Sequence, residues 1–158
     1  EVHKERKNSI LLLAGQGPLV EEIHEKVNEL GLNESVRFLG QRKDIDKLYQ
    51  AMDLFLFPSL YEGLGMVAVE ALVSGLPCVV STEIPEIAKV TEKITFVNLE
   101  NKKETWTEII FKYIKNINRK NINFTDGIKK YDIIKEATKL EKKYLNLYKR
   151  NEVKNGQN

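Results

Sequence analysis

The chain has 158 residues, of which 42% are hydrophobic and 30% are charged, with a formal net charge of +2. This length and apolar content are enough for one domain with its own core, and the small net charge argues against a dedicated nucleic-acid-binding protein. A single cysteine, Cys78, excludes a disulfide framework and a cysteine-based zinc site, and no apolar run approaches the roughly 20 residues of a membrane-spanning helix.

Short apolar runs alternate with amphipathic segments along the chain. Five runs have the composition of strands buried on both faces: residues 10–14, 36–40, 54–58, 77–81 and 94–97. Helical spacing of apolar residues falls between and after these runs: residues 19–31, a short segment after Asp44, 65–75, 84–90, from about 104 onward, and about 134–150. This alternation predicts an α/β fold in which a Rossmann-like parallel sheet is flanked by helices.

Charge is distributed unevenly over the chain. Residues 1–101 contain 10 basic and 16 acidic residues, whereas residues 102–158 contain 15 basic and 7 acidic ones. We interpret the basic segment as solvated helical surface, with contact to an anionic membrane as the alternative. The pattern predicts one domain over residues 1–150 and a disordered tail over 151–158.

The turn after the third strand is the most informative segment, because ligands of open α/β sheets bind at the carboxyl ends of the strands. Here Gly63 and Gly65 let the backbone turn sharply and approach a ligand closely. The helix that follows begins with free N–H groups and a partial positive charge, which favour phosphate. An ordinary strand-to-helix turn containing glycines is the structural alternative.

Two glutamates flank this helix start. Glu70 stands among apolar residues, where an ionised carboxylate is costly unless it meets a donor, and it shares a helix face with Met66. It could accept two hydrogen bonds from a ribose diol, or make a structural bond to a backbone N–H or a buried arginine. Glu62 stands eight residues earlier, in the loop. The pair favours a sugar nucleotide, with the diphosphate on backbone N–H groups between them.

The segment containing both glutamates resembles the central signature of retaining GT-B glycosyltransferases, most closely family 4. The resemblance rests on Glu62 and Glu70 as an E-x7-E pattern, on the residues 58–66 around it, and on Gly75-Leu76-Pro77 beyond it. Residues 14–18, 36–40, 51–56 and 85–87 resemble further segments of the family in the same order. Leu64 stands where phenylalanine is commoner in the family.

The resemblance implies transfer of a sugar, with retention, from a nucleoside-diphosphate sugar, with a UDP-sugar as the expected donor and no metal or other cofactor. Carried across by position, Glu62 is the catalytic residue facing the donor sugar, and Glu70 binds the ribose. Gln41 and Arg42 would lie beside the base. The other implied donor-binding residues are Gly15, Gly17, Gly63, Leu64, Gly65, Met66 and Val67.

The sequence also departs from the family. It contains neither the N-terminal acceptor-binding domain nor the first strand of the donor domain with the Arg and Lys that follow it. We therefore expect a piece of a longer protein, inactive alone, because those cations stabilise the leaving diphosphate. The expected partners are the nucleotide-sugar donor and the acceptor domain of the same protein, with no nucleic acid.

The resemblance further implies a glycan or lipid-linked acceptor and a role in surface polysaccharide synthesis. The expected location is the cytoplasm, with association at the cytoplasmic face of a membrane as an extension of it. Two alternatives stay open: a sugar-nucleotide epimerase of GT-B architecture, and a non-catalytic flavodoxin-like or receiver-type signalling domain. A receiver domain needs an acidic cluster after its first strand, but this sequence has Gly15-Gln16-Gly17 there, which argues against that alternative.

Overall fold

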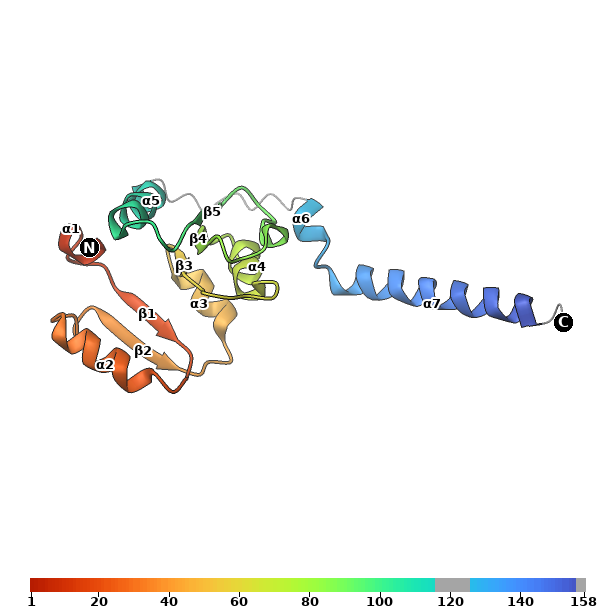
Figure 1. The fold of residues 1–158 in the computed structure, drawn as a ribbon, viewed down its shortest axis with the longest axis horizontal. Coiled ribbons are helices and arrows are strands. Elements are labelled where there is room, and N and C mark those ends of the chain that lie inside the picture. The colour runs from red at the N-terminus through yellow and green to blue at the C-terminus, as the bar shows by residue number, and fades with distance from the viewer. Residues whose placement is uncertain (116–125, 156–158) are drawn as a thin grey trace.

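A computed structural model describes residues 1–115 and 126–155 and shows a compact α/β body from which one long helix projects (Figure 1). Its strands are β1 (Leu11–Ala14), β2 (Val36–Gly40), β3 (Phe55–Phe57), β4 (Cys78–Ser81) and β5 (Ile94–Val97). Its helices are α1 (Val2–Glu5), α2 (Val20–Glu29), α3 (Ile45–Ala51), α4 (Met66–Val73), the 3-10 turn η1 (Glu86–Ala88), α5 (Lys103–Lys115), α6 (Asp126–Lys129) and α7 (Ile133–Asn155). All five predicted strands are therefore present.

Every strand pairing is parallel, as predicted, but the hydrogen bonds divide the strands into two sheets. One sheet consists of β1 and β2, and the other has the order β3–β4–β5. The sequence predicted a single sheet, whereas the structure has two. Strand β1 lies at the edge of one sheet and β3 lies at the edge of the other. The α/β class with parallel strands and flanking helices is nevertheless the one expected.

The core lies on both faces of the three-stranded sheet, with β4 at its centre. Alternating side chains of β4 point to opposite faces, so Cys78 and Val80 join the cluster around α4 and Leu72, while Val79 joins a second cluster with Ile110 of α5. All four residues of β4 are fully buried. Burial makes Cys78 behave as a small apolar residue and raises the pKa of its thiol.

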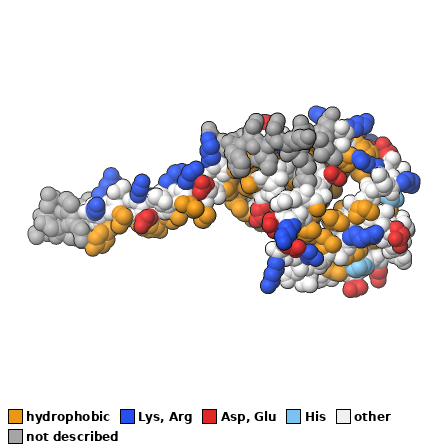
Figure 2. All heavy atoms as spheres, turned by 180° about the vertical axis from the view of Figure 1, so that it is seen from behind, with side chains coloured by type: hydrophobic (Ala, Val, Ile, Leu, Met, Phe, Trp, Pro, Cys, Tyr) orange, Lys and Arg blue, Asp and Glu red, His pale blue; other side chains and the backbone are white. Residues whose placement is uncertain are grey.

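Helix α7 differs from its prediction in length and stands away from the body. It continues through Asn155, whereas the sequence predicted an end near residue 150 and disorder beyond it; residues 156–158 lie outside the described chain. Ile133, Leu140 and Tyr148 remain more than half exposed. Figure 2 shows hydrophobic side chains along one side of this helix and Lys and Arg along the other. The apolar side chains on this face are thus uncovered in the structure.

None of the described helices, α7 included, combines the length and the apolar character that crossing a bilayer requires.

Candidate functional site

The loop between β3 and α4 is fixed at its start and open at its tip. The buried Ser81 hydroxyl, at the carboxyl end of β4, donates a 2.6 Å hydrogen bond to the Ser59 carbonyl. The Ser59 hydroxyl lies 3.0 Å from the Tyr61 carbonyl and 3.3 Å from Oε1 of Glu62. Leu60 and Tyr61 point outward, 82% and 86% exposed. The loop therefore holds Glu62 in place while its tip faces solvent.

Gly65 ends this loop and starts α4. Its φ of 71° lies in the left-handed region, and a Cβ on it would come 2.8 Å from Cγ2 of the buried Ile84. Glycine is thus required here for both conformation and space. No side chain caps the N-terminus of α4, so the N–H groups of Met66 and Val67 stay available at the positive end of the helix, whereas those of Ala68 and Val69 donate to the Gly65 carbonyl.

The structure corrects the prediction for the surroundings of Glu70. The apolar neighbours Ala68, Val69, Ala71 and Leu72 point into the core, whereas Glu70 is exposed on the outer face of α4 together with Met66 and Val67. The expectation that Glu70 lies among apolar side chains, which was one reason to select it as a site residue, is therefore wrong. The shared face with Met66 is confirmed.

Glu70 has a side-chain partner that the sequence did not indicate. The hydroxyl of Tyr49, on α3, donates to Oε2 of Glu70 at 3.3 Å. The pKa of Tyr49 is raised, mainly by burial and secondly by the nearby Glu70 carboxylate. The Tyr49 hydroxyl therefore stays protonated and can donate at neutral pH. The bond orients one carboxylate oxygen of Glu70. Neither a backbone N–H nor a buried arginine, the two structural alternatives, is the donor in this bond.

Replacing Tyr49 by phenylalanine is expected to lower the free energy of unfolding by about 1 kcal/mol. The ring stays packed edge-on against Phe55, while the hydroxyl and its hydrogen bond to Glu70 are removed. Urea unfolding followed by circular dichroism measures the difference. Tyr113→Phe, which removes a 2.8 Å contact with the Thr95 hydroxyl on the other face, is the matched control. No loss in Tyr49→Phe would mean that the bond contributes nothing.

The remaining predicted residues follow the two-stranded sheet. Gly15 and Gly17 come directly after β1, where a Cβ on either would meet no atom within 4 Å, and the Gly15 N–H donates to the Gly40 carbonyl at 2.9 Å. Arg42 forms two hydrogen bonds, of 2.8 and 2.7 Å, with the carboxylate of Asp44, which raises its pKa. The Arg42 guanidinium is thus oriented by Asp44, a pairing that the sequence pattern did not indicate. Gln41 is exposed.

The predicted residues therefore form two groups at strand carboxyl ends. Glu62 to Glu70 follow β3 and enter α4, and Gly15, Gly17, Gln41 and Arg42 follow β1 and β2. The structure adds Ser59, Ser81 and Tyr49 as residues that support the first group. Position at the end of β4 could have indicated Ser81, but nothing in the sequence connects Tyr49 with Glu70, 21 residues later.

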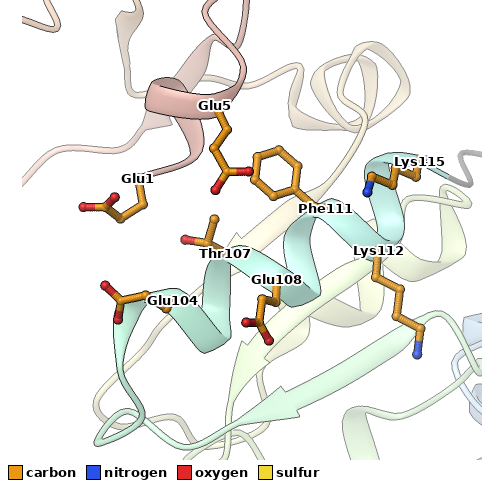
Figure 3. A pocket seen from close by; sticks show the side chains of 8 residues that line it. All are labelled: Glu1, Glu5, Glu104, Thr107, Glu108, Phe111, Lys112 and Lys115. Carbon is orange, nitrogen blue, oxygen red and sulfur yellow. The ribbon is translucent and has the colours of Figure 1, made fainter.

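A separate hollow lies between α1 and α5, on the face opposite α4. Figure 3 shows Glu5 beside Phe111 there, with Glu1, Glu104 and Glu108 around them. Lys4 and then Lys103 lower the pKa of Glu1 to about 2. None of the predicted site residues lines this hollow. Over residues 1–115 and 126–155, no group of three or more His, Cys, Asp or Glu side chains is placed to hold a metal.

Comparison with known proteins identifies the family. A family model described as glycosyl transferases group 1 matches residues 1–122. The chain belongs to this family. The glycosyl transferases group 1 model thus covers both groups of predicted residues, and the fold is the one found in GT-B glycosyltransferases.

Individual relatives agree with this assignment. The chain is 43% identical over 101 residues to the glycosyltransferase EpsF of Bacillus subtilis (strain 168), covering 63% of this chain and 26% of EpsF. It is 35% identical over 75 residues to the Escherichia coli UDP-Gal:alpha-D-GlcNAc-diphosphoundecaprenol alpha-1,3-galactosyltransferase, covering 47% of this chain and 19% of that enzyme. The matched part is thus about a quarter or less of these two relatives.

A solved structure shares the fold. HepE of Anabaena, in complex with UDP, superposes with a TM-score of 0.71 at 23% identity, covering 87% of this chain and 41% of HepE. At this identity the likeness supports the α/β fold.

Proposed function

We propose that this chain is the donor-binding part of a retaining glycosyltransferase of the family 4 type, with Glu62 and Glu70 as its E-x7-E pair. The observation that carries the proposal is the arrangement around α4. An uncapped helix N-terminus follows β3, with the loop carboxylate of Glu62 before it and the exposed carboxylate of Glu70 one turn beyond Met66. Family membership supports the reaction class.

Each of these residues would bind a different part of a sugar nucleotide. Backbone N–H groups of residues 63–67 bind the diphosphate, because the positive end of α4 favours negative charge. Glu70, oriented by Tyr49, accepts hydrogen bonds from the ribose diol. Glu62, oriented by Ser59, faces the donor sugar and stabilises its reacting centre. Neither carboxylate needs to act as a proton-transfer base.

The second group of residues would complete the donor site. Gln41 and Arg42 lie beside the base, and the open backbone at Gly15 and Gly17 forms the floor. We propose a UDP-sugar as the donor, with no metal or other cofactor. The names of the galactosyltransferase relative and of the HepE complex support uridine. We further propose a glycan or lipid-linked acceptor, bound by another domain of the same protein on the cytoplasmic side, in surface polysaccharide synthesis.

In the full-length protein, UDP is expected to raise the melting temperature by several degrees more than ADP or GDP does. Ligand at about 100 times its Kd stabilises the native state by about 2.7 kcal/mol. Differential scanning fluorimetry with the three diphosphates measures this. Glu70→Ala is expected to abolish most of the shift, while Glu25→Ala, at an exposed position on α2, keeps it. Equal shifts in Glu70→Ala and the unaltered protein would contradict the ribose assignment.

Product analysis separates transfer from the epimerase alternative. Incubation with UDP-sugar and a membrane or glycan extract as acceptor source is expected to yield a glycosylated product together with UDP. Release of UDP with an epimerised free sugar and no glycosylated product would contradict transfer.

A further inference from the structure

A tight turn at the carboxyl end of β4 lies against the loop that contains Glu62. The Ile84 N–H donates to the Ser81 carbonyl at 3.2 Å and closes this turn. Between these two residues, the Thr82 N–H donates to the Val97 carbonyl of β5 at 3.1 Å. The turn is therefore fixed to the sheet and gives the loop a rigid support.

The turn holds the loop at two points. At the start of the loop, the Ser81 hydroxyl donates to the Ser59 carbonyl at 2.6 Å, beyond the last paired residues of β3 and β4. At the end of the loop, the buried Ile84 packs so closely on Gly65 that a Cβ there would lie 2.8 Å from Cγ2 of Ile84. In the chain, Glu62 lies between these two points.

Ser81 is the one polar residue of β4, and all four residues of this strand are fully buried. Burying a hydroxyl among apolar side chains is unfavourable unless the hydroxyl has a hydrogen-bond partner. The partner of the Ser81 hydroxyl is a carbonyl 22 residues earlier in the chain, in the loop that contains Glu62. The Ser81 side chain therefore connects the central strand to this loop.

Hydrogen bonds, rather than packing, hold the middle of the loop. The side chains of Leu60 and Tyr61 are exposed, so they contribute little packing. The Ser59 hydroxyl has one proton and two acceptors within reach, the Tyr61 carbonyl at 3.0 Å and Oε1 of Glu62 at 3.3 Å. A small displacement of Ser59 would therefore give this proton to the Tyr61 carbonyl alone and leave Glu62 without the bond.

We propose that Ser81 is a positioning residue for Glu62 in sugar transfer and acts through Ser59. This inference rests on the proposed function, in which Glu62 stabilises the reacting centre. Ser81 fixes the backbone of Ser59, which keeps the Ser59 hydroxyl within reach of the Glu62 carboxylate. The backbone N–H groups of residues 63–67 follow Glu62, toward the end of the loop that Ile84 supports. Loss of the Ser81 hydroxyl should therefore affect the chemical step more than donor binding.

Ser81→Ala in the full-length enzyme tests this role. Displacement of a catalytic group by about 1 Å can lower a rate by about a hundredfold, so kcat is expected to fall by about ten- to a hundredfold. The donor KM is expected to stay within about threefold of the parent, because binding of the ground state is unaffected. Unchanged kcat, or a rise in KM that accounts for the whole loss of kcat/KM, would overturn the proposal.

Thr107→Val is the matched control for loss of a buried hydroxyl. The Thr107 hydroxyl also donates to a backbone carbonyl, that of Lys103 at 2.8 Å, but it lies within α5 and away from the loop. This variant is expected to keep the kcat of the parent. A loss of kcat equal to that of Ser81→Ala would mean that removal of any buried hydroxyl has this effect, and would overturn the proposal.

A double-mutant cycle with Ser59→Ala tests the route. Ser59→Ala keeps the carbonyl that Ser81 binds but removes the hydroxyl that reaches Glu62, and it is expected to lower kcat as much as Ser81→Ala does. In this background, Ser81→Ala is expected to lower kcat by less than about a further threefold, because both changes remove the same support. Full kcat in Ser59→Ala, which replaces a half-buried residue outside the core, or fully multiplicative losses in the double variant, would overturn the proposal.

Glu62→Ala separates this inference from the proposed function. An inactive Glu62→Ala enzyme beside a fully active Ser81→Ala enzyme would overturn the positioning role alone. Full activity in Glu62→Ala would overturn the catalytic assignment of Glu62, and the positioning role with it.

Discussion

Glu62→Ala in the full-length enzyme is expected to lower kcat for sugar transfer by at least about a hundredfold. This is the range found when one preorganised group that stabilises a transition state is removed. The side chain is half-buried and lies 3.3 Å from the Ser59 hydroxyl, so its carboxylate is held in one place by the loop. A glycosylation assay at saturating donor measures the loss, and UDP binding is expected to change much less than kcat.

Two further variants make this result specific. Glu62→Gln keeps the shape of the side chain but not its charge, and it is expected to be nearly as inactive as the alanine variant. Glu25→Ala is expected to retain full activity. The free energy of unfolding should change by less than about 0.5 kcal/mol in all three variants, since each position is near the surface and outside the core. Full activity in Glu62→Ala would show that the assignment of the catalytic residue is wrong.

Gly65→Ala is expected to lower the free energy of unfolding by about 2–5 kcal/mol. The left-handed φ of 71° costs a residue with a Cβ about 1–2 kcal/mol. The new methyl group would lie 2.8 Å from Ile84 Cγ2, and relief of such overpacking costs about 1–3 kcal/mol more. Because Gly65 also sets the first turn of α4, loss of the UDP-induced thermal shift is expected as well.

Gly63→Ala is the matched control for this substitution. An added Cβ at Gly63 would meet no atom within 4 Å, and its φ lies outside the left-handed region. Its unfolding free energy should stay within about 1 kcal/mol of the parent in urea unfolding. Equal costs at the two glycines would mean that neither the φ of Gly65 nor Ile84 explains the effect. A double-mutant cycle with Ile84→Ala isolates the steric part.

The order of strands and helices could be predicted because short apolar runs alternate with helical periodicity. The runs at 36–40 and 94–97 coincide with β2 and β5, since both end at a clear change to polar residues. The helix predicted at 84–90 is only the turn Glu86–Ala88, because Pro85 lies in extended conformation before it. The end of α7 was predicted too early, because charged residues after 150 continue the helix as well as they would continue a loop.

The candidate site could be predicted only in part, because local patterns do not contain long-range contacts. The position of Glu62 and Glu70 around the start of α4 follows from spacing and helix geometry. The exposure of Glu70 does not, because an apolar run of sequence gives no indication of which residue faces outward. The Tyr49–Glu70 bond joins α3 and α4, and the stacking of His24 on Phe38 joins α2 and β2 at a centroid distance of 3.6 Å. Both depend on how the elements pack.

The buried thiol of Cys78, at the start of the central strand β4, can report how often the core opens. Cys78 has no exposed surface, and its raised pKa keeps the reactive thiolate scarce. An alkylating reagent can therefore react only after β4 separates from its neighbours. At fixed pH, the rate of iodoacetamide labelling is expected to follow the opening of the core, and UDP should slow it if the donor closes the site around α4. Mass spectrometry of the Cys78 peptide would follow this opening in a cell extract, with no engineered probe.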